Sequence, residues 1–127
     1  MPLIRISHAA GKSEADTAAL SQGVHRALVD AFGIPEDDFF QIITEHVPAK
    51  GLLYPKTFLG IDHGDEVVFV QITAAEGRST DQKKALFNAI VDNIERDAGV
   101  PRQDVIINIV ETKRENWSFG NGVAPFA

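Results

Sequence analysis

The chain has 127 residues, 44% of them hydrophobic, which suits a single domain with one apolar core. Its net charge of −6 and its 12 scattered basic residues argue against a surface that binds nucleic-acid phosphates. Cysteine is absent, which excludes disulfides, thiolate catalysis and cysteine-bound metal centres. Because neither a signal-like start nor a long apolar run is present, we expect a cytoplasmic protein without membrane partners.

The two halves of the chain repeat one another. Residues 3–47 align without a gap on residues 66 positions further along, and eleven identities share this register. Gly33 falls on Gly99, and Asp38 falls on Asp104. So many matches in one register indicate an internal duplication.

Each half predicts the same order of elements. Strands are expected in the apolar runs 3–7, 39–45, 67–73 and 105–111. Ser13 and Ser79 suit helix N-caps, because a serine hydroxyl accepts from free backbone N–H groups. The Gly-x-Pro triplets at 33–35 and 99–101 then end the helices, since glycine adopts the left-handed cap and proline cannot continue a helix. The chain is therefore predicted to be β-α-β, twice.

Two such units predict an α/β fold, in which a four-stranded mixed sheet carries both helices on one face. The runs "VVFVQIT" and "VIINIVE" are almost continuously apolar, as expected of strands that are covered on both faces. A chain of this length has no further helices to cover the second face. We therefore expect a homo-oligomer in which subunits cover one another's sheets.

Two segments break the periodicity. Residues 47–65 are rich in glycine and proline and predict a connecting loop. The tail 114–127 places Trp117 and Phe119 among glycines, where they are expected to form a short hairpin over a neighbouring subunit or to line a pocket. The expected organisation is one domain, 1–127, with repeats at about 3–47 and 67–113.

Four stretches, in this order, resemble the tautomerase superfamily: "MPLIRIS", "AFGIPEDD", "EGRSTDQK" and "NWSFGNG". The resemblance is to the branch of malonate semialdehyde decarboxylase, and the third stretch is also similar to the helix start of 4-oxalocrotonate tautomerases. It implies a trimer that acts on small keto, enol or unsaturated carboxylic acids without metal or organic cofactor. It also implies that removal of Met1 exposes a catalytic amino-terminal proline.

The same resemblance assigns roles to five residues. Pro2 matches the general base or acid, and Arg78 matches the arginine that holds the substrate carboxylate or polarises its carbonyl. Asp38 matches an aspartate that assists the proline or a water molecule. Trp117 and Phe119 match an aromatic wall beside the proline.

Proton transfer within a keto acid needs a base with a pKa near ambient pH, and a free α-amino group has a pKa of about 7.7 to 8.0. Burial beside aromatic side chains and a nearby arginine both disfavour the cation. A secondary amine also forms an iminium with aldehydes, which opens a route to decarboxylation. The leading hypothesis is a tautomerase, and a decarboxylase or hydratase is the alternative.

Each assignment has a structural alternative. Pro2 also suits the rigid first residue of a strand, and Asp38 suits a turn like that of Asp104. A basic residue such as Arg78 at a helix start opposes the helix dipole, which indicates an anionic partner. Decarboxylases of this branch typically show two arginines around this helix start, whereas residues 74–76 here precede a lone arginine, so the particular reaction stays open. A non-catalytic oligomeric binding protein on the same scaffold is a hypothesis of another class, which a retained Met1 would favour.

Overall fold

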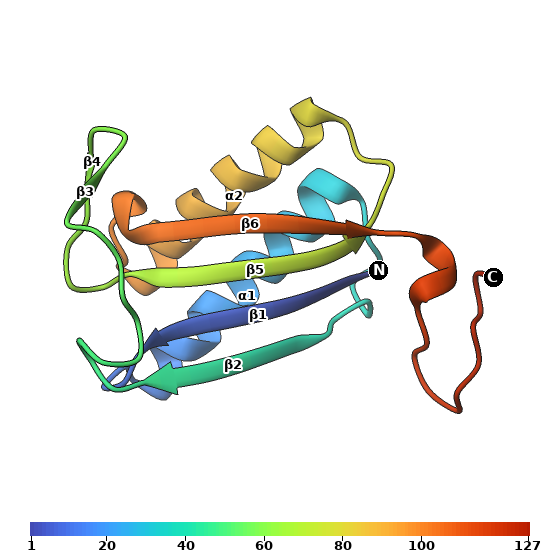
Figure 1. Cartoon of the computed structure of the whole chain (residues 1–127), viewed down its shortest axis with the longest axis horizontal. Coiled ribbons are helices and arrows are strands. Elements are labelled where there is room, and N and C mark those ends of the chain that lie inside the picture. Colours follow the sequence, from blue (N-terminus) through green and yellow to red (C-terminus); the bar gives the residue numbers. More distant parts are fainter.

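The computed structural model describes residues 1–127, and its main elements follow the duplication (Figure 1). The first half contains β1 (Pro2–Ala9), α1 (Glu14–Phe32) and β2 (Gln41–His46), and the second half contains β5 (Val68–Ala75), α2 (Thr80–Ala98) and β6 (Val105–Thr112). An offset of 66 residues converts the bounds of β1 and α1 into those of β5 and α2. The predicted internal repeat is confirmed.

Both helices begin and end where the sequence predicted. The hydroxyl of Ser13 accepts from a backbone N–H three residues later, and Ser79 forms a reciprocal capping box with Gln82. Gly33 and Gly99 end the helices with φ of 67° and 69°, in the left-handed region that glycine adopts at little cost. Neither helix combines the length and apolarity that a membrane crossing requires.

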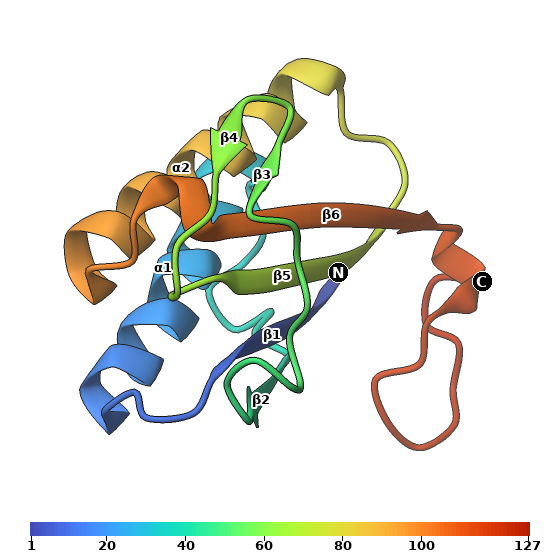
Figure 2. The ribbon, with the colours of Figure 1, turned by 60° about the vertical axis from the view of Figure 1, so that its left-hand side comes forward.

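The four long strands form one mixed sheet in the order β2-β1-β5-β6. β1 is antiparallel to β5 at the centre, and each pairs in parallel with the second strand of its own repeat. Figures 1 and 2 show both helices on the same face, as predicted. Ile4, Ile72, Leu28 and Ile90 are buried between the sheet and the helices. The predicted fold class is therefore confirmed.

The opposite face of the sheet is uncovered in the single chain. Alternate strand residues point to this face, where Leu3, Ile42 and Val110 keep 40%, 42% and 52% of their surface exposed. Arg5 and Gln71 lie opposite each other across β1 and β5, and both are exposed. We call this surface the open face. Its mixture of apolar and polar side chains resembles that of an interface more than that of a core.

The prediction that residues 47–65 form a connecting loop was incomplete, because a small hairpin lies within them. β3 (Thr57–Phe58) and β4 (Ile61–Asp62) pair in an antiparallel manner at the far end of the sheet from the tail (Figure 1). Leu59 and Gly60 connect them with φ of 53° and 76°, and positive φ at both central residues matches the twist of a tight hairpin.

The tail differs from the hairpin that we expected. Arg114–Asn116 form a short 3-10 helix, η2, and the remaining residues form turns without a strand. Figure 1 shows the chain leaving the end of β6 and folding back on itself beyond the sheet. Because it leaves the sheet there, it has no strand edge with which to pair.

Candidate active site

One end of the sheet gathers every residue that the sequence nominated. β1 and β2 begin at this end, β5 and β6 finish there, and the tail continues from it (Figure 1). The start of α2 follows directly from the end of β5. This convergence results from the antiparallel pairing of β1 with β5, which places the amino terminus beside the last residues of β5.

Pro2 is buried as the first residue of β1, and it lies opposite Ala74 of β5. The amino group of Met1, one residue earlier, donates to Oδ2 of Asp38 over 2.7 Å. Only 11% of the Met1 side chain and 15% of the Asp38 side chain are exposed. The second carboxylate oxygen, Oδ1, is buried without a hydrogen-bond partner. Asp38 therefore has one oxygen on the amino terminus and one still free to accept a hydrogen bond.

Asp104 occupies the equivalent position in the second repeat and has an equivalent contact. Its carboxylate accepts from the backbone N–H groups of Gly64 and Glu66, over 2.7 Å and 3.2 Å. Both aspartates thus bind the backbone that leads into the first strand of their own repeat. In the first repeat, the group that the aspartate binds is the amino group of Met1 instead of a backbone N–H.

Arg78 lies immediately before the N-cap of α2 and is held by two contacts. Its Nη1 donates to the carbonyl oxygen of Ala75 over 3.1 Å, and its guanidinium carbon lies 4.9 Å from the centre of the Phe32 ring. Ala75 adjoins Ala74, the strand partner of Pro2. The cation is therefore fixed beside the end of β5 and the helix start, where an anion is favoured.

Glu111 of β6 adds a negative charge near this arginine. The hydrogen bond from Lys83, at 2.8 Å, lowers the pKa of the Glu111 carboxyl against the opposing effect of desolvation. The charge of Lys83, the N–H of Gly77 and the charge of Arg78 lower this pKa further. The helix start thus already attracts one carboxylate of the protein itself.

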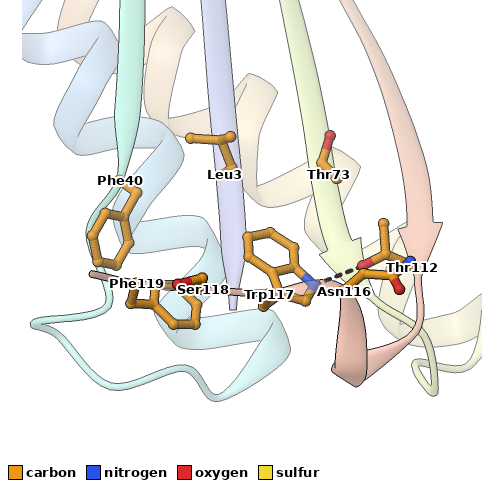
Figure 3. A pocket seen from close by; sticks show the side chains of 8 residues that line it. All are labelled: Leu3, Phe40, Thr73, Thr112, Asn116, Trp117, Ser118 and Phe119. Atoms are coloured by element: carbon orange, nitrogen blue, oxygen red, sulfur yellow. Dashed lines mark hydrogen bonds between the residues drawn. The ribbon is translucent and has the colours of Figure 1, made fainter. Parts of the chain in front are cut away.

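A cavity of about 460 Å³ lies beside the start of β1, on the side of the open face (Figure 3). Its walls contain four apolar and four polar residues without a charge: Leu3, Phe40, Thr73, Thr112, Asn116, Trp117, Ser118 and Phe119. The rings of Trp117 and Phe119 stack at 5.6 Å between centres and 11° between planes. The centre of the Phe40 ring lies 5.3 Å from the centre of the Phe119 ring in the same wall.

The structure brings some of the nominated residues together and keeps others apart. Asp38 reaches the amino terminus, and Trp117 stacks on Phe119. Neither Pro2 nor Arg78 lines the aromatic cavity in the single chain. The expected aromatic wall lies beside Leu3 instead, because adjacent strand residues point to opposite faces of the sheet.

Three residues of this region were not predicted from the sequence: Phe32, Phe40 and Thr112. Phe40 was assigned to a strand, although it precedes β2 and is 42% exposed. Phe32 is the last residue of α1 and has the pattern of a core residue. Thr112 ends β6 and has no local signal, because its role depends on where the tail folds.

The chain belongs to the tautomerase family. Two family models, both described as "Tautomerase enzyme", match residues 38–120 and 2–58. The chain is 35% identical over 124 residues to the probable tautomerase YusQ of Bacillus subtilis (strain 168), covering 98% of this chain and 97% of that protein. The resemblance seen in the sequence motifs is therefore confirmed.

Two solved structures extend the comparison. A malonate semialdehyde decarboxylase, whose structures are described as a basis for decarboxylase and hydratase activities, matches with a TM-score of 0.89 and 34% identity, over 98% of this chain and 95% of that one. A symmetric trimer of fused 4-OT matches with a TM-score of 0.78 and 21% identity, over 95% and 94% of the two chains. The second likeness supports the fold alone.

Proposed function

We propose that the protein is a cofactor-independent tautomerase that acts on a small keto or enol carboxylic acid. After removal of Met1, the secondary amine of Pro2 moves the proton, and Arg78 holds the substrate carboxylate. The observation that carries the proposal is the 2.7 Å contact between Asp38 and the amino group of Met1, the residue that precedes Pro2. It supports an amino-terminal amine that is half enclosed at the edge where the aromatic cavity also opens.

The surroundings of the amine act on its proton in opposite directions. In general, burial and a neighbouring cation favour the neutral amine, whereas a neighbouring carboxylate favours the protonated form. The neutral amine suits proton abstraction, and the protonated amine suits proton donation to a developing enol or alcohol. A positioned acid or base contributes about 10² to 10⁴ in rate, and an arginine on the developing enolate adds electrostatic stabilisation.

Decarboxylation or hydration of a three-carbon oxo acid is the alternative reaction. The unpaired Oδ1 of Asp38 supports it, because this oxygen is free to accept a hydrogen bond from a water molecule. The similarity to malonate semialdehyde decarboxylase gives further support. Release of carbon dioxide from malonate semialdehyde would favour this alternative, and its absence would exclude the decarboxylase.

We also propose a homotrimer, in which neighbouring subunits cover the open face and complete the aromatic cavity. Leu3 lines that cavity and is 40% exposed in the single chain, which leaves room for residues from another subunit. A non-catalytic binding protein with the same assembly is the remaining hypothesis. A retained Met1 would favour it, since Pro2 nitrogen is then a non-basic amide.

The decisive experiment compares the intact mass with the activity of Pro2 variants. We expect loss of one methionine from the purified chain, and turnover of phenylenolpyruvate by the wild type. Pro2→Ala replaces the secondary amine with a primary amine of different basicity and geometry, and we expect it to reduce kcat/KM by about 10² or more. Pro55→Ala, in the exposed loop at the other end of the sheet, is the matched control and should keep wild-type activity.

A retained Met1 or unchanged turnover in Pro2→Ala would refute the assigned base. The pH–rate profile of the wild type then identifies the working form of the amine. A rate that rises with pH indicates the neutral base, and a rate that falls indicates the protonated acid.

A further inference from the structure

The tail after β6 forms one wall of the aromatic cavity, yet it has few connections to the sheet. Outside the regular elements, the backbone hydrogen bonds of residues 114–127 join these residues to one another or to Lys113. One side-chain hydrogen bond links them to the sheet: Nε1 of Trp117 donates to Oγ1 of Thr112 over 2.7 Å (Figure 3). The orientation of the aromatic wall therefore depends on Thr112.

The hydroxyl of Thr112 is itself oriented by the sheet. It donates to the carbonyl oxygen of Ala74 over 3.3 Å, which leaves its lone pairs free to accept from the indole. Ala74 is the strand partner of Pro2. A continuous series of contacts thus runs from Trp117 through Thr112 and Ala74 to the residue that carries the proposed catalytic amine.

The other contacts of the tail cannot fix its orientation in the same way. Phe119 meets Phe40 at 5.3 Å with a tilt of 42°, and it meets Phe126 edge-on at 6.3 Å. Aromatic contacts of this kind tolerate several ring arrangements, whereas a hydrogen bond of 2.7 Å specifies both distance and direction. Phe119 and Phe126 are also 40% and 47% exposed, so solvent competes for their surfaces.

We propose that Thr112 is a positioning residue, which fixes Trp117 as the wall of the substrate cavity and thereby sets substrate affinity. The proposal rests on the proposed function, because it takes this cavity as the place where the substrate's carbon skeleton binds. Thr112 acts through Trp117, and its loss affects the position of the wall more than the proton transfer itself.

The first test uses fluorescence, which needs no turnover. Trp117 is the only tryptophan, so intrinsic emission reports its surroundings directly. Thr112→Val keeps the shape of the side chain but removes the acceptor, and we expect red-shifted emission with stronger quenching by acrylamide. Thr112→Ser keeps the hydroxyl and should restore the wild-type spectrum. Thr17→Val is the matched control, because Thr17 lies on α1, outside this cavity and without a hydrogen bond to Trp117.

The second test separates binding from chemistry. We expect Thr112→Val to raise KM about threefold to tenfold, the range of one lost hydrogen bond, while kcat changes little. Trp117→Phe keeps an aromatic ring but has no N–H donor. In the Trp117→Phe background, Thr112→Val should therefore have almost no further effect on KM, because the two residues act as one unit.

The outcomes separate this proposal from the proposed function. Unchanged emission and quenching in a folded Thr112→Val variant would refute the proposal that Thr112 fixes the position of Trp117. Changed emission with an unchanged KM, or additive effects in the double variant, would overturn the positioning role. If the wild type turns over no keto acid, the proposed function fails, while the fluorescence result still decides whether Thr112 holds the tail.

Discussion

Arg78 is the residue whose position is most fully explained by its own contacts. The Ala75 carbonyl takes one of its N–H groups, and the face of Phe32 supports its guanidinium, so the remaining donors are free for a ligand. A planar guanidinium with free parallel donors suits a carboxylate, which accepts two hydrogen bonds side by side. The arrangement suits a fixed anchor rather than a mobile surface charge.

Substitution of Arg78 should therefore weaken substrate binding first. We expect Arg78→Ala to raise KM about tenfold to a hundredfold, the range of a lost charge-assisted pair. Arg78→Lys should recover only part of this affinity, because lysine is a point charge without the planar donors. Steady-state kinetics on a keto acid measure both effects. As a control, Arg26→Ala removes an exposed arginine of α1, which pairs with Glu36, and should leave KM unchanged.

An unchanged KM in Arg78→Ala would remove this residue from the site.

At this scale, sequence motifs were enough to nominate Pro2, Arg78 and Asp38 for testing. They could not nominate Phe32, whose contact with Arg78 joins distant segments, or Thr112, whose contact with Trp117 depends on the path of the chain through η2. The hydrogen bond from Trp117 to Thr112 exists only because the tail folds back after η2.

Among the structural elements, the two repeats provide an internal comparison for Asp38. Asp104 is 1% exposed and binds two backbone N–H groups, which is a structural role. Asp38 binds the amino terminus and keeps one oxygen unpaired. Asp104 therefore stabilises a backbone turn, whereas Asp38 keeps one carboxylate oxygen free to accept a hydrogen bond.

The same substitution at both positions should give different results. We expect Asp104→Asn to destabilise the fold by about 1 to 3 kcal/mol, because the amide has only one acceptor oxygen for the two backbone N–H groups that the buried carboxylate binds. Asp38→Asn should cost less stability and instead lower kcat, since the carboxylate beside the amine is lost. Thermal unfolding and kinetics on both variants measure this contrast.

If Asp38→Asn affects only the melting temperature, its role is structural like that of Asp104. The element scale was otherwise well predicted, because Ser and Gly caps are local signals that specify where each helix begins and ends. The β3–β4 hairpin was missed because its turn is Leu59–Gly60, which lacks the Asn-Gly or Asp-Gly pair typical of such turns.

For the whole molecule, the open face is the feature that a single chain does not explain. Val110 is 52% exposed on this face, on the edge strand β6, next to polar residues that suit an interface. The sequence predicted this face from the almost continuous apolar strands and predicted the topology from the duplication. The arrangement of neighbouring subunits depends on the shapes of several surfaces together, which periodicity does not encode.

We expect native mass spectrometry to detect three chains of 13.8 kDa in one assembly. Val110→Glu should dissociate it while the monomer keeps its circular dichroism, because a charge is tolerated at an exposed position but costly beneath a neighbour. Ala18→Glu places the same charge on the exposed side of α1 and should leave the assembly intact. A monomeric wild type, or an intact trimer in Val110→Glu, would contradict this arrangement.

The hairpin at the far end of the sheet has a consequence for how the two ends can diverge. β1 and β5 are antiparallel, so the starts of the two repeats lie at opposite ends of one sheet. One start is a chain terminus, and the other is continuous with the β3–β4 hairpin that Asp104 secures. The two repeats thus have nearly the same backbone, but only the second is preceded by another segment of the chain. Insertions or substitutions in the hairpin can therefore remodel one end without altering the spacing around the amine at the other.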